Sequence, residues 1–286
     1  MSDTGPWDRI LLRHVRDGFV DHESIARQWR GLNFLAPPDL GLAIEQYERF
    51  VELLRSSAPV SITEAQQHLS LDSIYIRDAS VICAKGAILC RMGKPQREAE
   101  PAALAECYRS LGIQIVGTID APGKLEGGDV TWLGPRLAVV GRGYRTNDDG
   151  IRQLRELLGD TIDELIVVPL PHYRGPGDVF HLMSIISPVD RDLAVVYSPL
   201  MPVPFRERLL DLDYSLVEVP DDEFDSMGAN VFALSPRRCL MVEGNPRTRA
   251  ALERAGAEVL VYDGSEISLK GGGGPTCLTR PVQLGT

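Results

Sequence analysis

A cysteine that follows a run of glycines is the strongest candidate in this chain for covalent chemistry. Cys277 lies in the stretch GGGGPTCLT, after Gly271–Gly274. Glycines allow the backbone to approach a ligand closely, which would leave the thiol at a pocket wall, and a thiolate there can act as a nucleophile. The alternatives are a buried structural cysteine and a flexible glycine tail. No GK[ST] follows the glycines, so they do not predict a phosphate-binding loop.

Two further segments carry groups that could move a proton or bind a cation. His181 lies between Phe180 and Leu182 and is a candidate acid and base, although a single histidine among apolar residues is more commonly a hydrogen-bonded core residue. Glu126 and Asp129 flank a Gly-Gly pair and place two carboxylates beside flexible backbone. We take both as candidate site residues, with a polar turn as the alternative.

The fourth candidate segment is Asp72–Asp78, which reads DSIYIRD. Its alternation of polar and apolar residues predicts a half-buried strand. Asp72, Arg77 and Asp78 are therefore candidate binding residues near a strand end. The alternative is a structural ion pair between Arg77 and Asp78.

Elements that would position these residues recur along the chain. Glycine landmarks stand at Gly128, Gly177, Gly228 and Gly274, at steps of roughly 50 residues, a period typical of propellers and repeat arrays. A helix followed by short strands cannot bury its own apolar faces, so five such units in a ring would share a core and leave no exposed sheet edge. Polar residues at matching points would then converge on the axis. The alternative is an open α/β sheet.

The apolar pattern predicts the helices and strands of these units. Helices are expected near 44–54, 101–111, 151–158, 204–210 and 246–255. Strands are expected at 60–62, 81–84, 87–90, 113–117, 137–140, 165–170, 193–197, 216–219, 239–242 and 257–262. No linker divides the chain, so we predict one catalytic domain over residues 1–286, with 1–31 as a candidate N-terminal extension.

Composition restricts the function classes. The chain has 286 residues, 44% hydrophobic and 24% charged, which is typical of a globular protein. Its net charge of −10 argues against nucleic acid or an anionic membrane as partner and favours a small cationic substrate. Five cysteines without a CxxC pair indicate neither a disulfide framework nor a zinc site. The start of the chain does not read as a signal peptide, so we expect a cytoplasmic protein without a membrane span.

Taken together, the motifs resemble the guanidine-modifying superfamily, which includes arginine deiminases, amidinotransferases and dimethylarginine dimethylaminohydrolases. The resemblance extends from about Gly31 to Pro281. It rests, in order, on Arg77-Asp78, Arg97, Leu125–Asp129, Gly141 with Arg145-Thr146-Asn147, Phe180-His181-Leu182 and the glycines before Cys277. It implies the pentein fold, an α/β class five-bladed pseudo-symmetric propeller of ββαβ units, and an enzyme most like the dimethylarginine hydrolases.

The resemblance also implies roles for the catalytic candidates. Cys277 would be the nucleophile, His181 the general acid and base, Glu126 the partner of His181, and Asp78 the carboxylate that holds the guanidinium. Such a hydrolase would cleave a guanidinium C–N bond of an N-substituted arginine through a covalent thiouronium, giving citrulline and an amine, with no cofactor and no metal.

At the other end of the substrate, the resemblance implies that Arg97 and Arg145 bind the α-carboxylate. Arg77 stands where dimethylarginine hydrolases have a glutamate that helps to hold the α-amino group, and Asp72 is left to serve there. Met183 stands where arginine deiminases have an aspartate that holds the guanidinium, which argues against free arginine as the substrate. An amidinotransferase, an arginine deiminase and a non-catalytic binding module stay open as alternative functions. The oligomeric state is open as well, with a homodimer as one possibility.

Overall fold

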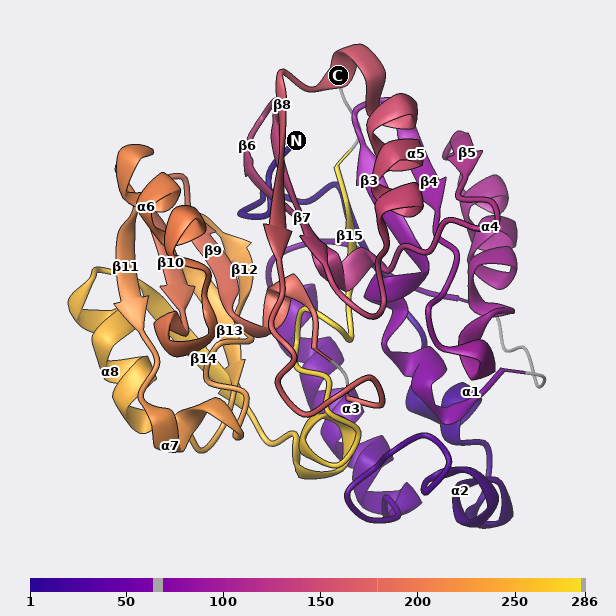
Figure 1. Cartoon of the computed structure of the whole chain (residues 1–286). Coiled ribbons are helices and arrows are strands. Elements are labelled where there is room, and N and C mark those ends of the chain that lie inside the picture. Colours follow the sequence, from indigo (N-terminus) through magenta and orange to yellow (C-terminus); the bar gives the residue numbers. More distant parts are fainter. Residues whose placement is uncertain (64–68, 179, 284–286) are drawn as a thin grey trace.

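The computed structural model describes residues 1–63, 69–178 and 180–283, whose strands form five small sheets (Figure 1). Each sheet has three strands. They are β15 (Arg280–Val282), β1 (Arg9–Leu12) and β2 (Val60–Ile62); β3 (Ser80–Cys83), β4 (Gly86–Leu89) and β5 (Ile115–Thr118); β6 (Val130–Gly134), β7 (Leu137–Arg142) and β8 (Glu164–Pro169); β9 (Ile186–Asp190), β10 (Leu193–Val196) and β11 (Ser215–Glu218); β12 (Phe232–Ser235), β13 (Arg238–Val242) and β14 (Glu258–Tyr262).

Four sheets share one connectivity: an antiparallel hairpin, a helix, and a third strand parallel to the second. A crossover helix is the usual way to join parallel neighbouring strands. The chain must run back to the starting end of the sheet before the next strand begins, and a tight turn is too short for this. The crossovers are α4 (Glu100–Ser110), α5 (Asp148–Leu158), α6 (Val203–Asp211) and α8 (Pro246–Arg254). The short α7 (Asp221–Phe224) joins β11 to β12, and α1 (Val15–Phe19), α2 (His22–Gln28) and α3 (Leu40–Arg55) lie between β1 and β2.

Helix α5 illustrates how the sequence forms a crossover. The Asn147 side chain caps its N-terminus by accepting a backbone N–H of the first turn. Ile151, Leu154 and Leu158 recur at helical spacing and are all buried, so they form the stripe that packs on the sheet. The negative charges of Asp148 and Asp149 in the first turn interact favourably with the positive end of the helix dipole.

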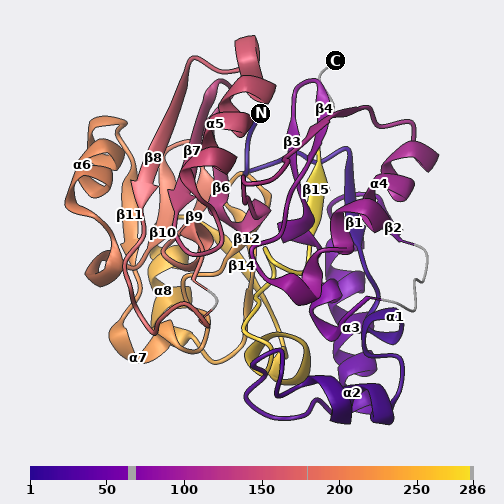
Figure 2. The same cartoon turned by 45° about the vertical axis from the view of Figure 1, so that its right-hand side comes forward.

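Burial shows how the sheets are arranged around the ring. The first strands of the hairpins, β3, β6, β9 and β12, together with β15, are buried along nearly their whole length. The parallel strands at the other sheet edges, β2, β5, β8, β11 and β14, are partly exposed. The buried strands therefore face the axis of a five-bladed α/β propeller (Figure 2), as the sequence predicted.

Both ends of the chain build the fifth blade. Strand β1 is its central strand, antiparallel to β15 from the C-terminal end and parallel to β2. Residues 1–31, which the sequence left as a candidate extension, thus carry a buried strand of the ring. Pairing of the two ends completes the fifth sheet. The inner edge strands of all five sheets are buried, which protects them from pairing with another chain.

The structure corrects one element near the expected site. Asp72–Asp78 is not a strand: it forms two short 3₁₀ turns, η1 (Leu71–Ile74) and η2 (Ile76–Ala79), in which every residue is buried. The alternating pattern was misleading because polar and apolar side chains here are buried alike, and the charged ones pair with opposite charges.

Most of the other predicted elements are confirmed within a few residues. The five predicted helices correspond to α3, α4, α5, α6 and α8, and the predicted strands to β2–β5, β7, β8, β10, β11, β13 and β14. The sequence did not predict β1, β6, β9, β12 and β15. Among the described residues, no helix combines the length and apolar character that crossing a bilayer requires.

Replacing Ile10 by alanine tests the contribution of β1 to the ring. Ile10 is fully buried, so truncation leaves a cavity, and we expect the free energy of unfolding to fall by about 2–5 kcal/mol in urea denaturation. Ile62→Ala, in β2 of the same sheet, is the matched control. Because Ile62 is 42% exposed, this substitution should lower the free energy of unfolding by less than about 1 kcal/mol. Equal losses would contradict the buried position of β1.

Candidate active site

Each blade contributes a polar side chain just ahead of its innermost strand. Asp78 lies in η2 before β3, Glu126 before η4 (Gly127–Asp129) and β6, and His181 before η6 (Leu182–Ser184) and β9. Asn230 precedes β12 and Cys277 precedes β15. Residues far apart in sequence meet because the five blades share one axis.

A cavity of about 370 Å³ lies at this end of the axis. Cys277, His181 and Asp78 all line it, so the structure brings the expected thiol, imidazole and carboxylate together. The expected binding residues Asp72, Arg97 and Arg145 line it as well, as does Met183. Apolar side chains complete the wall, among them Leu35, Phe180, Phe224 and Met227. Such a partly apolar cavity with a few convergent polar groups is typical of a small-molecule site.

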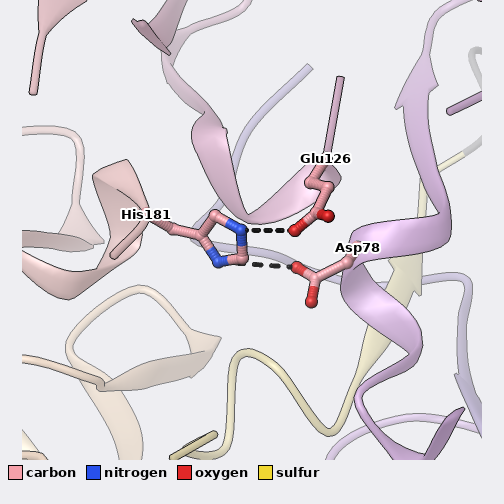
Figure 3. A group of neighbouring side chains, drawn as sticks. All are labelled: Asp78, Glu126 and His181. Carbon is pink, nitrogen blue, oxygen red and sulfur yellow. Dashed lines mark hydrogen bonds and ion pairs between the residues drawn. The ribbon is translucent and has the colours of Figure 1, made fainter. Parts of the chain in front are cut away.

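His181 and Glu126 form the central pair of the site (Figure 3). His181 Nε2 lies 2.7 Å from Glu126 Oε2, and its Nδ1 lies 3.8 Å from Asp78 Oδ1. Glu126 is fully buried, and Arg145 Nη1 donates to both of its carboxylate oxygens at 3.0 and 3.1 Å. The backbone N–H of Gly93 donates to Oε1 at 2.8 Å. These donors fix the carboxylate, which in turn orients the imidazole.

The charges around His181 favour its protonated form. Burial alone would lower the pKa of His181, but the carboxylates of Asp78, Asp129 and Glu126 together raise it to about 9. Burial opposes ionisation of Glu126 too, yet the hydrogen bond with His181 and the charge of Arg145 lower the pKa of Glu126 well below its ordinary value. At neutral pH the pair is an imidazolium beside a carboxylate.

Asp78 is held by a buried guanidinium. Arg97 Nη1 donates to Asp78 Oδ2 at 2.6 Å, while its Nε and Nη2 donate to the two oxygens of Glu100. Nη2 also donates to the carbonyl of Tyr75. With four donations made inside the protein, Arg97 is positioned chiefly to neutralise Asp78 and Glu100, whereas the sequence predicted that it binds the substrate's α-carboxylate.

Cys277 is held by a residue that the sequence analysis missed. Asn230 Nδ2 donates to the Cys277 sulfur at 3.4 Å, and its Oδ1 accepts from the Thr276 backbone and hydroxyl. Burial and the nearby Asp78 carboxylate raise the pKa of the Cys277 thiol. The repeat offered the missing signal, since Gly228-Ala229-Asn230 stands at the same point of its unit as the other site residues.

Asp72 carries an ion pair at the cavity wall. Lys94 Nζ lies 2.5 Å from Asp72 Oδ2, and both side chains are about nine-tenths buried or more. The same ammonium donates to the carbonyl of Leu32 at 2.8 Å. The Asp72 carboxylate, expected to meet the substrate's amino group, is thus already neutralised by the protein.

Two expected binding residues do not line the cavity. Arg77 lies within the core, where it pairs with Asp3 at 3.3 Å and donates to the carbonyl of Thr276. Its partners in the described part of the chain thus differ from the Arg77–Asp78 ion pair that was the alternative. Asp129 is fully buried behind His181, accepting from the Thr146 hydroxyl and the Leu182 N–H. Its contribution is structural and electrostatic.

The donors Asp78, Glu126 and His181 lie within 4.8 Å of one another, as three metal ligands would. Their surroundings do not fit a cation, however. Arg97 and Arg145 already neutralise the two carboxylates, and His181 carries a positive charge at neutral pH. A divalent ion here would meet three cationic groups.

Comparison with known proteins agrees with this geometry. The profile of the family described as "Arginine deiminase" matches residues 70–213, half of the chain. A protein named N(G),N(G)-dimethylarginine dimethylaminohydrolase from Streptomyces coelicolor is 32% identical, over 84% of this chain and 86% of that protein. The chain belongs to this superfamily of guanidine-modifying enzymes. Within it, the chain is a dimethylarginine dimethylaminohydrolase-like member.

Two other matches extend the likeness over nearly the whole chain. The uncharacterized protein YkgA of Bacillus subtilis is 30% identical over 85% of this chain and 81% of its own length. A solved structure of dimethylarginine dimethylaminohydrolase from Pseudomonas aeruginosa, in complex with citrulline, superposes with a TM-score of 0.78. It covers 97% of this chain and 100% of that one at 24% identity, which confirms the pentein fold.

In this dimethylarginine dimethylaminohydrolase-like protein, Glu126→Gln tests the cause of the His181 charge. Removing the carboxylate takes away a hydrogen bond and an attractive charge, so we expect the pKa of His181 to fall from about 9 by at least about one pH unit. A titration of the imidazole by NMR measures it. Asp225→Asn, which removes a cavity-lining carboxylate paired with Arg174, is the control and should leave the value unchanged. An unaltered pKa of His181 in Glu126→Gln would show that the Glu126 carboxylate does not stabilise the protonated imidazole.

Proposed function

We propose that this protein hydrolyses a guanidinium carbon–nitrogen bond of an N-substituted arginine or a close relative. The products would be a ureido compound, citrulline in the case of arginine derivatives, and an amine. The observation that carries the proposal is the shared cavity: Cys277, His181 and Asp78 reach it from three blades. The activity named for the Streptomyces coelicolor relative supports it.

In this proposal Asp78 binds the guanidinium. Its Oδ2 accepts from Arg97, and its Oδ1 accepts from the Gly128 N–H at 3.1 Å and faces His181. A carboxylate has about four lone-pair sites, so further N–H donors of a planar cation can still be accepted. The charge-assisted hydrogen bonds would orient the central carbon toward Cys277.

Cys277 attacks that carbon in the first step. In the free protein the thiol keeps its proton, because burial and Asp78 raise the pKa of Cys277. A bound guanidinium brings a positive charge that offsets Asp78, so substrate binding itself favours the thiolate. The sulfur–carbon bond forms and gives a tetrahedral intermediate.

His181 then protonates the departing nitrogen. Its pKa of about 9 means that it holds a proton at neutral pH. As the carbon–nitrogen bond breaks, the amine leaves with that proton and a thiouronium stays on Cys277. Neutral His181 then takes a proton from water, the resulting hydroxide adds to the thiouronium carbon, and the sulfur–carbon bond breaks to release the ureido product.

An amidinotransferase would form the same covalent intermediate but transfer its amidino group to a second amine. An arginine deiminase would release ammonia from an unsubstituted guanidinium. Met183 at the cavity wall offers no carboxylate for a second grip on free arginine. A binding module without catalysis would leave the thiol unused. Product analysis separates these cases.

Cys277→Ser tests the covalent step. We expect the wild type to convert Nω-methyl-L-arginine or its des-amino analogue to a ureido product and methylamine, detected by mass spectrometry. The serine variant should lose activity by at least about a thousandfold and still bind the compound in calorimetry. Ser226→Ala, which removes a hydroxyl outside the cavity, is the control. Full activity in Cys277→Ser, or amidino transfer to a second amine without a ureido product, would contradict the hydrolase.

The pH profile provides a second test. At neutral pH both the thiol and His181 hold a proton, whereas the reactive state holds one proton fewer, as thiolate and imidazolium. We therefore expect kcat/KM to rise from neutral pH up to about 9, the pKa of His181, and to fall at higher pH when both groups are deprotonated. Glu126→Gln should move the rising limb to lower pH. A profile that falls between neutrality and pH about 9 would contradict these assignments.

A further inference from the structure

The wall of the cavity that Cys277 lines already contains an ammonium group, that of Lys94. On this ground, and resting on the function proposed above, we infer that the substrate is a guanidino carboxylic acid without an α-amino group. The protein supplies at this point the charge that the amino group of an amino acid would bring.

The contacts of Lys94 define the site. Its Nζ lies 2.5 Å from Asp72 Oδ2 and 2.8 Å from the carbonyl oxygen of Leu32. A carboxylate and a carbonyl are both acceptors, and together they form a site suited to an ammonium. The Lys94 side chain is 11% exposed and that of Asp72 is 6% exposed, so the pair is largely removed from water. Asp72, Lys94 and Leu32 all line the cavity.

The backbone holds Lys94 in this place. Its N–H donates to Glu126 Oε1 at 3.3 Å, and Pro95 follows it as the first residue of η3 (Pro95–Arg97). The preceding Gly93 packs so tightly on Arg145 that a Cβ there would lie 2.8 Å from the Arg145 Cα. The lysine is thus joined to the same carboxylate that orients His181, and it is not a mobile surface side chain.

A substrate α-ammonium would find the buried Asp72 carboxylate already paired. It would have to displace Lys94 from Asp72 or lie beside a like charge that is poorly screened by solvent. Arg77, at the position where related hydrolases carry a glutamate, points into the core toward Asp3. Of the other carboxylates that line the described cavity, Asp78 pairs with Arg97 and Asp225 pairs with Arg174. Asp178 is partly exposed to solvent, where an ion pair contributes little.

A carboxylate, in contrast, fits this part of the cavity. Lys94 has three N–H donors, of which Asp72 and the Leu32 carbonyl take two. Arg145 lies next to Gly93 and also lines the cavity, with its Nη1 committed to Glu126. A substrate carboxylate that reaches both cations would accept hydrogen bonds from the third N–H of Lys94 and from Arg145, with the guanidinium at Asp78.

The experiment compares three methylated guanidines: Nω-methyl-L-arginine, its des-amino analogue and its decarboxylated analogue. For the wild type we expect kcat/KM for the des-amino acid to exceed that for the amino acid by at least about tenfold. The decarboxylated compound should be the poorest. Lys94→Met removes the charge at similar side-chain length and should reverse the order of the first two. Lys270→Met, at another lysine of the cavity wall paired with Glu266, should leave their ratio unchanged.

Binding separates failure of this inference from failure of the proposed function. Calorimetry with Cys277→Ser ranks the three compounds without any turnover, and the des-amino acid should again bind at least about tenfold more tightly than the amino acid. If no compound is hydrolysed but this ranking holds, the hydrolase is wrong and the substrate class stands. If the amino acid is hydrolysed or bound as well as its des-amino analogue, the inference is overturned whether or not Lys94→Met folds.

Discussion

Compensation of buried carboxylates is the constraint on which the site depends. Asp78, Glu100 and Glu126 are nearly or fully removed from water around the propeller axis, where an unpaired charge would cost several kcal/mol. Arg97 spans the first two, and Arg145 together with His181 neutralises the third. Arginine suits this task because its planar fork can serve two carboxylates at once and stays charged when buried.

This pairing has chemical consequences. Because Arg145 and His181 share Glu126, the imidazole is both oriented and charged, which makes it a proton donor at neutral pH. Asp78, although paired with Arg97, remains close enough to Cys277 to disfavour its thiolate. The resting site therefore keeps the Cys277 thiol protonated. Under the proposed function, the positive charge of a bound guanidinium would lower the pKa of that thiol.

The ring makes such a site possible from short elements. Each blade turns inward just before a buried strand, so one polar residue per blade reaches the axis without a long loop. The fifth blade uses both chain ends, with β1 from the start of the chain between β15 and β2. Cys277 precedes β15, so the strand pairing that closes the ring also positions the thiol.

Local patterns in the sequence determined the crossover helices, most strands and the repeating glycine turns, because amphipathic period and turn chemistry act over a few residues. Repeat symmetry also predicted that Cys277, His181, Glu126 and Asp78 lie together. Tertiary structure alone decided which way Arg77 points, that Asn230 holds the thiol, that 72–78 turns instead of extending, and that Lys94 pairs with Asp72. Those outcomes depend on which charges meet when segments far apart in the chain are buried together, and spacing along a sequence does not contain that information.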